Sequence, residues 1–321
     1  MLEPVGLICL QVPEFYKGCD WLNSTKDRLI HLHRCRGITR RILRRIIHHD
    51  PTLNQIYTLS SSEISKLLSL PPDNAGMLFS DIHNPWIQKQ ISADHARYSI
   101  ITIVDDTYPP MLKTIKDPPL VLYATGKLSL LKYAPSISII GTRNPSSEAK
   151  QKVELLTKPL VSKGWLIISG MAKGIDSYAH LSALNGLGNT IAVLGGGFHH
   201  IYPKQNINLF RQIAKKGLVL SEYPPDTPPK RYHFPERNRI ISGLSFGTLV
   251  IEATEKSGTL ITVDQALDQG REVYTVPGSP FIPQTKGCHI MIQEGAKLVI
   301  DPVDIMEDWE NIGIHLMQSV K

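Results

Sequence analysis

The sequence has few cysteines, and their spacing excludes a disulfide framework. Among its 321 residues only four are cysteine, at positions 9, 19, 35 and 288, and no two of them form a CxxC pair. Secreted domains that depend on disulfides are far denser in cysteine. The composition is therefore typical of a protein in a reducing compartment, and we expect a cytoplasmic location.

A long apolar run is also lacking. No run reaches the 18 residues that a membrane-spanning helix needs, and the N-terminal segment has neither a basic start nor an unbroken apolar stretch. We therefore expect no signal peptide and no membrane partner. Hydrophobic residues make up 42% and charged residues 20% of the chain, which is the balance of a globular protein of about two domains.

The usual fingerprints of nucleotide cofactors are missing. After the first strand of the sheet domain described below, the sequence reads GTR at 141–143 instead of G-x-G-x-x-G, and no Walker A loop occurs. No acidic residue follows the second strand at the spacing that a ribose contact requires. NAD and ATP binding are therefore disfavoured, and we expect no cofactor.

The twelve histidines do not predict a metal site. Two adjacent pairs stand out, His48-His49 and His199-His200. Neighbours in sequence rarely converge on one ion without further ligands. We therefore expect no metal.

The chain carries a modest net charge of +6 at pH 7. Such an excess leans toward a polyanionic partner such as nucleic acid, although many proteins without one are equally basic. Part of the excess is an arginine cluster on one side of a predicted helix, formed by Arg40, Arg41, Arg44 and Arg45. These arginines are either further DNA contacts or the solvated face of an amphipathic helix.

This helix belongs to a first zone, residues 1–94, in which helical patterns are separated by glycine and proline. Gly37 breaks one run, Asp50-Pro51 ends the next, and Pro71-Pro72 ends a third. We predict a small all-helical domain of the sterile-alpha-motif (SAM) or helix-hairpin-helix type.

Residues 95–301 predict an α/β domain. Two short β-branched runs, 100–104 and 120–123, stand among prolines and indicate a strand-turn-strand extension of a sheet. From 136 to 300, apolar strands alternate with helical segments, which is the pattern of a mostly parallel sheet covered on both faces. We predict an extended Rossmann-like domain, followed by a C-terminal tail at 302–321 that is too short for a domain.

Loops at the carboxyl ends of these strands are rich in glycine and hydroxyl groups. Parallel strands joined by right-handed crossovers end at one edge of the sheet, where ligands bind. Glycine lets the backbone approach an anion, and a helix start offers it free N–H groups. We therefore predict a phosphate-binding edge built from GTR at 141–143, SGMAKGID at 169–176, PERNR at 235–239 and SGT at 257–259.

In order along the chain, these and neighbouring segments spell the motifs of a known family. They are GTR at 141–143, SGMAKGIDSYAH at 169–180, TIAVLGGG at 190–197, SEYP at 221–224, FPERNRIISGLS at 234–245 and VIEATEKSGTLIT at 250–262. With these motifs the chain resembles the DNA-processing protein A (DprA/Smf) family, from about residue 98 to residue 299.

The resemblance implies a protein without catalytic turnover that binds single-stranded DNA in natural transformation. Such a protein protects incoming strands, helps to load the RecA recombinase on them and forms a homodimer. By the same resemblance, Arg143 and Lys173 face the phosphates. Asp176 and His180 also match the motif, and of the two roles open to them, contact with the ligand and support of the loop, we expect support of the loop. The predicted DNA-binding set consists of Arg143, Lys173 and further residues of the family motifs and the strand-end loops. These further residues are Gly141, Thr142, Ser169, Gly170, Gly174, Arg237, Asn238, Arg239, Ser257, Gly258 and Thr259.

The chain departs from the family pattern at a few positions. His289 stands where the family usually has asparagine, His199 where an acidic residue is common, and Glu148-Ala149 where an aromatic-glycine pair is usual. The family often carries a winged-helix module at its C-terminus, and the tail at 302–321 does not contain it: either the protein naturally lacks this module or the sequence is truncated before it. These departures affect local hydrogen bonding, not the predicted fold.

An enzyme acting on nucleotides is the alternative, because the fold also resembles phosphoribohydrolases of the cytokinin-activating type. Those carry a P-G-G-x-G-T motif with a catalytic glutamate three residues after the threonine. Here SGT at 257–259 is followed at that distance by Thr262. Proton transfer and stabilisation of an oxocarbenium ion require a carboxylate, so this position argues against chemistry.

For a DNA strand, exposed aromatic side chains would add stacking platforms for bases. Phe198, Tyr232 and Phe234 lie near the predicted edge and are candidates. Ordinary packing is the competing interpretation for each of them.

Overall fold

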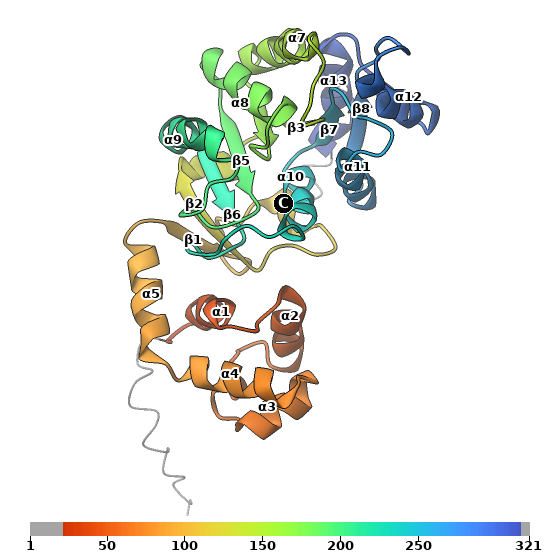
Figure 1. Ribbon diagram of the computed structural model, residues 1–321. Coiled ribbons are helices and arrows are strands. Elements are labelled where there is room, and N and C mark those ends of the chain that lie inside the picture. The colour runs from red at the N-terminus through yellow and green to blue at the C-terminus, as the bar shows by residue number, and fades with distance from the viewer. Residues whose placement is uncertain (1–21, 316–321) are drawn as a thin grey trace, which may run out of the picture. The chain divides into compact units, whose positions relative to one another are not determined.

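The computed structural model describes residues 22–315 (Figure 1). The chain forms two compact units, and the boundary between them in the sequence lies between Ser92 and Ala93. The start of the predicted helical domain, residues 1–21, and the end of the predicted tail, residues 316–321, lie outside the described part. Within residues 22–315, every helix is too short or too polar to cross a membrane.

The first unit consists of helices, as the sequence predicts. Ser24 and Ser60 each form a reciprocal capping box at a helix start, and Leu43 and Ile64 are fully buried among the helices. Pro72 opens a helix instead of only ending one, because proline is well tolerated in a first turn. The helices are α1 (Thr25–Arg34), α2 (Arg40–His49), α3 (Ser61–Leu68), α4 (Pro72–Ile82) and α5 (Pro85–His95), which leads into the second unit, with a 3-10 turn at Gln55–Tyr57.

The second unit is built on one mixed sheet, and the predicted strand segments are confirmed. Its order is β1-β2-β6-β5-β4-β3-β7-β8-β9. The extension strands β1 and β2 pair antiparallel with each other, β2 pairs antiparallel with β6, and all other pairs are parallel. The strands are β1 (Ser99–Thr102), β2 (Val121–Gly126), β3 (Ser136–Ile140), β4 (Leu166–Ser169), β5 (Thr190–Leu194), β6 (Leu218–Ser221), β7 (Gly247–Val250), β8 (Glu272–Thr275) and β9 (Lys297–Leu298).

Helices cover both faces of this sheet (Figure 1). One apolar cluster joins the sheet to α7, α8 and α13, and a second joins its other face to α6, α10, α11 and α12. The helices are α6 (Pro110–Lys113), α7 (Ala149–Ser162), α8 (Ile175–Asn185), α9 (Ile207–Lys216), α10 (His233–Gly243), α11 (Thr259–Asp268), α12 (Lys286–Gln293) and α13 (Val303–Asp308). Short helical turns lie at Leu128–Lys132, Lys204–Asn206, Pro283–Thr285 and Trp309–Gly313. Burial on both faces explains why the central strands are almost wholly apolar.

The direction in which the sheet grows reverses at β3. From β3 the chain adds β4, β5 and β6 on one side, and then adds β7, β8 and β9 on the other. The loops that follow β3 and β7 therefore leave the sheet in opposite directions. In open α/β sheets such a point leaves a crevice at the carboxyl ends of the strands, and ligands bind there.

A buried histidine on α8 fixes part of this frame. The Thr190 hydroxyl donates to the Ile167 carbonyl at 2.8 Å, so it accepts a hydrogen bond from His180 Nδ1 at 2.7 Å. His180 Nε2 is buried and has no hydrogen-bond partner among residues 22–315. Burial is the main cause that lowers the pKa of His180 to about 3, and the nearby Arg237 cation is a smaller one. His180 is therefore neutral in the folded protein and protonated in the unfolded chain below pH 6.5.

We expect His180→Asn to reduce the acid sensitivity of folding. The unfolded chain takes up a proton that the folded protein excludes, so His180 lowers stability as the pH falls from 6.5 toward 3, by about 1.4 kcal/mol per pH unit. Between pH 7.5 and 5 the free energy of unfolding of the wild type should fall by about 2 kcal/mol more than that of the variant. Urea unfolding at both pH values measures the difference.

The exposed His200 offers the matched control, because His200→Asn removes an imidazole that has no buried environment. Its unfolding free energy should follow that of the wild type at both pH values. Equal acid losses in the wild type and His180→Asn would contradict the assignment.

Candidate nucleic-acid interface

A cavity of about 320 Å³ lies at the reversal point of the sheet. It is formed by the loops after β3 and β4, the first turns of α10, and the start of α11 with the loop before it. Of the predicted DNA-binding set, it brings together Gly141, Thr142, Arg143, Arg237, Asn238, Ser257, Gly258 and Thr259. Ser169, Gly170, Lys173, Gly174 and Arg239 do not line it.

Arg143 is the exposed cation of this cavity. Its guanidinium carbon lies 5.6 Å from the centre of the Phe234 ring, which also lines the cavity. No ion pair joins Arg143 to a carboxylate within residues 22–315. Its charge is therefore available to an incoming anion.

Arg237 lies at the same cavity but is only 4% exposed. Its Nη1 donates to the Val193 carbonyl at 2.7 Å. A Cβ at Gly170 would lie 1.7 Å from that nitrogen, so the guanidinium occupies the space that glycine leaves open. Burial lowers the pKa of Arg237 to about 10, although Asp176 opposes this shift.

Asp176, at the start of α8, is the carboxylate on the cavity lining. Its Oδ2 accepts a hydrogen bond from the Ala172 N–H at 3.3 Å. Burial raises the pKa of Asp176, while the Arg237 cation and backbone N–H groups act against that rise. Asp176 therefore faces the charge of Arg237 and also ties down the β4–α8 loop.

Arg239 serves a different part of the frame. It is 6% exposed and forms an ion pair with the buried Glu222. Its Nη1 also donates to the Asp117 carbonyl at 2.6 Å, which joins α10 to the loop before β2. Asn238 between the two arginines is half-buried and lines the cavity.

The β4–α8 loop packs directly on the loop after β3. Gly174 has φ +84°, and a Cβ there would lie 2.5 Å from the Thr142 carbonyl, so this contact requires glycine. The Ser169 hydroxyl is buried and donates to the Ile139 carbonyl at 2.6 Å. Lys173 is exposed and directly follows Ala172, which lines the cavity.

The start of α11 contributes hydroxyl and backbone groups to the cavity. Ser257 Oγ accepts the Thr259 N–H at 3.1 Å and donates to Thr259 Oγ1 at 2.8 Å. Thr262, one turn on, is buried and also lines the cavity.

The predicted arginine cluster belongs to α2 of the first unit. Leu43 and Ile46 form the buried side of this helix, whereas Arg41 and Arg45 are exposed. Arg45 donates to the Leu68 carbonyl, and Arg40 and Arg44 are partly buried. None of the four lines the cavity.

Two cations near the cavity were missed from the sequence. Lys230 and Arg231 are exposed in the β6–α10 loop, three to four residues before Phe234. In the sequence, this loop looks only like a proline-rich connection. The signal that could have identified the two cations is a Lys-Arg pair that directly precedes an aromatic residue and stands shortly before the RNR motif.

The aromatic candidates for stacking divide by exposure. Tyr232 is 57% exposed, and Phe234 is half-buried on the cavity lining next to the exposed Tyr202, with ring centres 5.7 Å apart. Phe198 is 5% exposed and packs on Tyr98. For Phe198 the competing interpretation, ordinary packing, therefore holds, since its ring belongs to the core.

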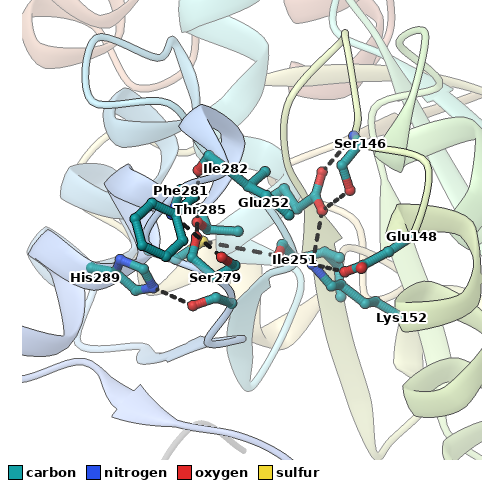
Figure 2. Close-up of polar contacts among 12 residues, drawn as sticks. Ser146, Glu148, Lys152, Ile251, Glu252, Ser279, Phe281, Ile282, Thr285 and His289 are labelled. Atoms are coloured by element: carbon teal, nitrogen blue, oxygen red, sulfur yellow. Dashed lines mark hydrogen bonds and ion pairs between the residues drawn. The ribbon is translucent and has the colours of Figure 1, made fainter.

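The departures from the family pattern form local contacts. His289 Nε2 lies 3.0 Å from the Gly278 carbonyl, and Glu148 lies 3.5 Å from Lys152 Nζ (Figure 2). His199 is exposed beside Tyr98, with ring centres 6.2 Å apart. Within residues 22–315, no three histidine, cysteine or acidic side chains gather as a metal site would require.

A family model and curated relatives both match most of this chain. The model of the DNA recombination-mediator protein A family matches residues 99–310. The DNA processing protein DprA of Bacillus subtilis is 51% identical over 208 residues, which cover 65% of this chain and 70% of that protein.

Two solved structures are also similar. The crystal structure of DNA processing protein A from Streptococcus pneumoniae matches with a TM-score of 0.77 and 35% identity, over 89% of this chain and 98% of that one. A structure of DNA processing protein A from Helicobacter pylori, described for its single-stranded DNA binding mode, matches with a TM-score of 0.60 and 29% identity, over 68% of this chain and 98% of that one. The chain therefore belongs to the DNA recombination-mediator protein A family, also known as DprA/Smf.

Proposed function

We propose that this protein binds single-stranded DNA along the cavity edge of its sheet, without performing chemistry on it. The observation that carries the proposal is Arg143, an exposed guanidinium at the crevice of the reversal point that forms no ion pair with a carboxylate of residues 22–315. A phosphate at this position meets the donor fork of Arg143 and the Thr259 hydroxyl, whose oxygen accepts the Ser257 hydroxyl and whose own hydrogen can be donated to a ligand.

Exposure separates the basic residues of this region by role. Lys173, Lys230 and Arg231 are exposed like Arg143 and supply contacts to further phosphates along a strand. Arg237 and Arg239 are buried and bonded to protein groups, so we assign them to holding α10 in place.

The cavity favours an unpaired strand over a duplex. Its volume of about 320 Å³ is at the lower end for ligand sites, and its walls combine the Phe234 ring with polar side chains. An unpaired base can stack there, whereas a base within a duplex is already paired and stacked. The relative from Helicobacter pylori, described as binding single-stranded DNA, supports this choice of ligand.

Replacing Arg143 and Lys173 together by alanine should weaken single-strand binding about 100-fold at low salt, because two charge-assisted contacts are lost. The slope of log affinity against log salt should flatten by about 0.7 for each lost phosphate contact. Fluorescence anisotropy with a labelled single strand across a salt series measures both quantities.

Lys158→Ala is the matched control for charge, because Lys158 is an exposed lysine of α7 that pairs with Glu154 at 2.6 Å. Its affinity and slope should stay near those of the wild type. A folded Arg143→Ala, Lys173→Ala protein with unchanged affinity and slope would refute the site assignment.

The absence of catalysis is part of the same proposal. Position 262, where the related hydrolases carry their glutamate, is a buried threonine. Asp176, the cavity carboxylate, is engaged with Ala172 and faces Arg237. A nucleotide-processing enzyme of the phosphoribohydrolase-like superfamily is the second candidate, favoured only by the fold.

Incubation with nucleoside monophosphates should release no free base above the background of buffer alone. Chromatography of the products, with the same preparation shown to bind a DNA strand, measures this. Base release that disappears in Asp176→Asn would establish the enzyme instead.

Within the cell we place this DNA binding in natural transformation and recombination in the cytoplasm. There the protein protects incoming strands as a homodimer and helps to load RecA on them. Membership of the recombination-mediator family supports this role.

Adding the protein should shorten the lag of DNA-dependent ATP hydrolysis by RecA on strands already covered by a single-strand binding protein. The Arg143→Ala, Lys173→Ala variant should not shorten it, because loading requires the strand to be held. If the wild type and the variant shortened the lag equally, RecA loading would not depend on this DNA site, and that part of the proposal would be refuted.

A further inference from the structure

Glu252 is a fully buried carboxylate two residues after the end of β7. Its side chain is 0% exposed, and it does not line the cavity. It accepts hydrogen bonds from the Ser146 N–H at 2.9 Å and from the Ser146 hydroxyl at 2.5 Å. Lys152 Nζ lies 3.0 Å from Oε1, and Figure 2 shows the carboxylate directed at both partners.

A buried ion pair of this kind contributes little net stability. The loss of hydration of two charges offsets most of their attraction, and apolar residues of similar volume are often as stable. What a carboxylate with several fixed donors does provide is one defined geometry for the groups that it joins. The groups joined here are the β3–α7 loop and the first turn of α7.

The same residue also holds the loop through its backbone. The Glu252 carbonyl accepts the Thr142 N–H at 2.8 Å, and its carboxylate holds Ser146 four residues further on. Only three residues, Arg143, Asn144 and Pro145, lie between these two attachment points. The exposed arginine of the cavity is therefore the first residue of a short span that Glu252 fastens at both ends.

We propose that Glu252 is a positioning residue for DNA binding, which acts through Ser146 and Lys152 to fix the backbone that carries Arg143. This inference rests on the proposed function of Arg143. A span fixed in advance loses less conformational entropy when the arginine meets a phosphate, so binding is tighter than with a loose span.

The sign of the effect distinguishes positioning from electrostatics. Glu252→Gln removes a negative charge, which on its own strengthens binding to a polyanion. The amide also replaces one acceptor oxygen by a donor facing the N–H of Ser146 or Lys152, which loosens the span. Positioning therefore predicts weaker binding despite the more favourable charge.

Anisotropy with a labelled single strand and the full chain tests this inference. Glu252→Gln and Ser146→Ala should each bind about tenfold more weakly than the wild type. Glu154→Gln is the matched control, because it removes a half-buried α7 carboxylate whose ion pair within residues 22–315 is with Lys158, and it should bind as tightly as the wild type or more tightly.

A double-mutant cycle separates a positioning role from general loss of structure. If Ser146 acts through Arg143, adding Ser146→Ala to Arg143→Ala should cost almost nothing further. Each variant is compared under conditions where circular dichroism shows it folded, and Ser146→Ala alone decides the question if Glu252→Gln does not fold.

If Arg143→Ala binds DNA weakly, the proposed function stands, and either of two results would then overturn the positioning role of Glu252. One is binding by folded Glu252→Gln and Ser146→Ala as tight as that of Glu154→Gln. The other is an equal loss from Ser146→Ala with and without Arg143. If Arg143→Ala itself binds as the wild type does, the proposed function fails instead.

Discussion

The parallel pairing of β3 with β7 is the constraint on which the rest of the second unit depends. Ile137 pairs with Gly247 and Ile140 with Val250, so two segments about 110 positions apart lie side by side at the centre of the sheet. Because the sheet grows away from this pair in both directions, the loops after the two strands diverge and leave the cavity between them. Every group of the cavity edge is placed relative to this one pair of strands.

Polar interactions then convert the crevice into a defined site. Buried cations and carboxylates, such as Arg237 facing Asp176 and Arg239 paired with Glu222, join helices to loops where apolar packing alone would allow sliding. The exposed cations at the rim, such as Arg143 and Lys173, form no ion pair with the part of the chain that the structure describes. Charge in this region therefore has two roles, one inside the protein that fixes geometry and one at its surface that is available to a ligand.

Much of this arrangement could be predicted from the sequence. The apolar runs of β3 to β8 predict a parallel sheet because strands buried on both faces have no polar alternation. Glycine-rich loops at the strand ends predict a binding edge because carboxyl ends of parallel strands share one edge. The motifs of the family add to both conclusions, and its membership is confirmed over residues 99–310.

The roles of individual cations could not be predicted in the same way. Arg237 and Arg239 lie in a motif that looks like a cationic stripe, but α10 is enclosed by the sheet and its neighbours, so both side chains are buried. Glu252 gave no signal either, since its partners stand 100 and 106 positions away and only the pairing of β3 with β7 brings them together. Phe198 shows the same limit, because an aromatic residue after a glycine run fits a core as well as a surface.

The distance in sequence between the two central strands also bears on how the site comes into being. Contacts between remote segments form late, since the chain must first close a long loop. A nascent chain on the ribosome that has emerged only through β6 has its first four parallel strands but no partner on the open side of β3. Three features depend on β7 and on the segment that follows it to α11: the crevice, the contacts of Glu252 with the β3–α7 loop, and the wall of the cavity formed by the start of α11. The proposed DNA site is therefore complete only once β7 and α11 have been synthesised, and it does not form gradually along the chain.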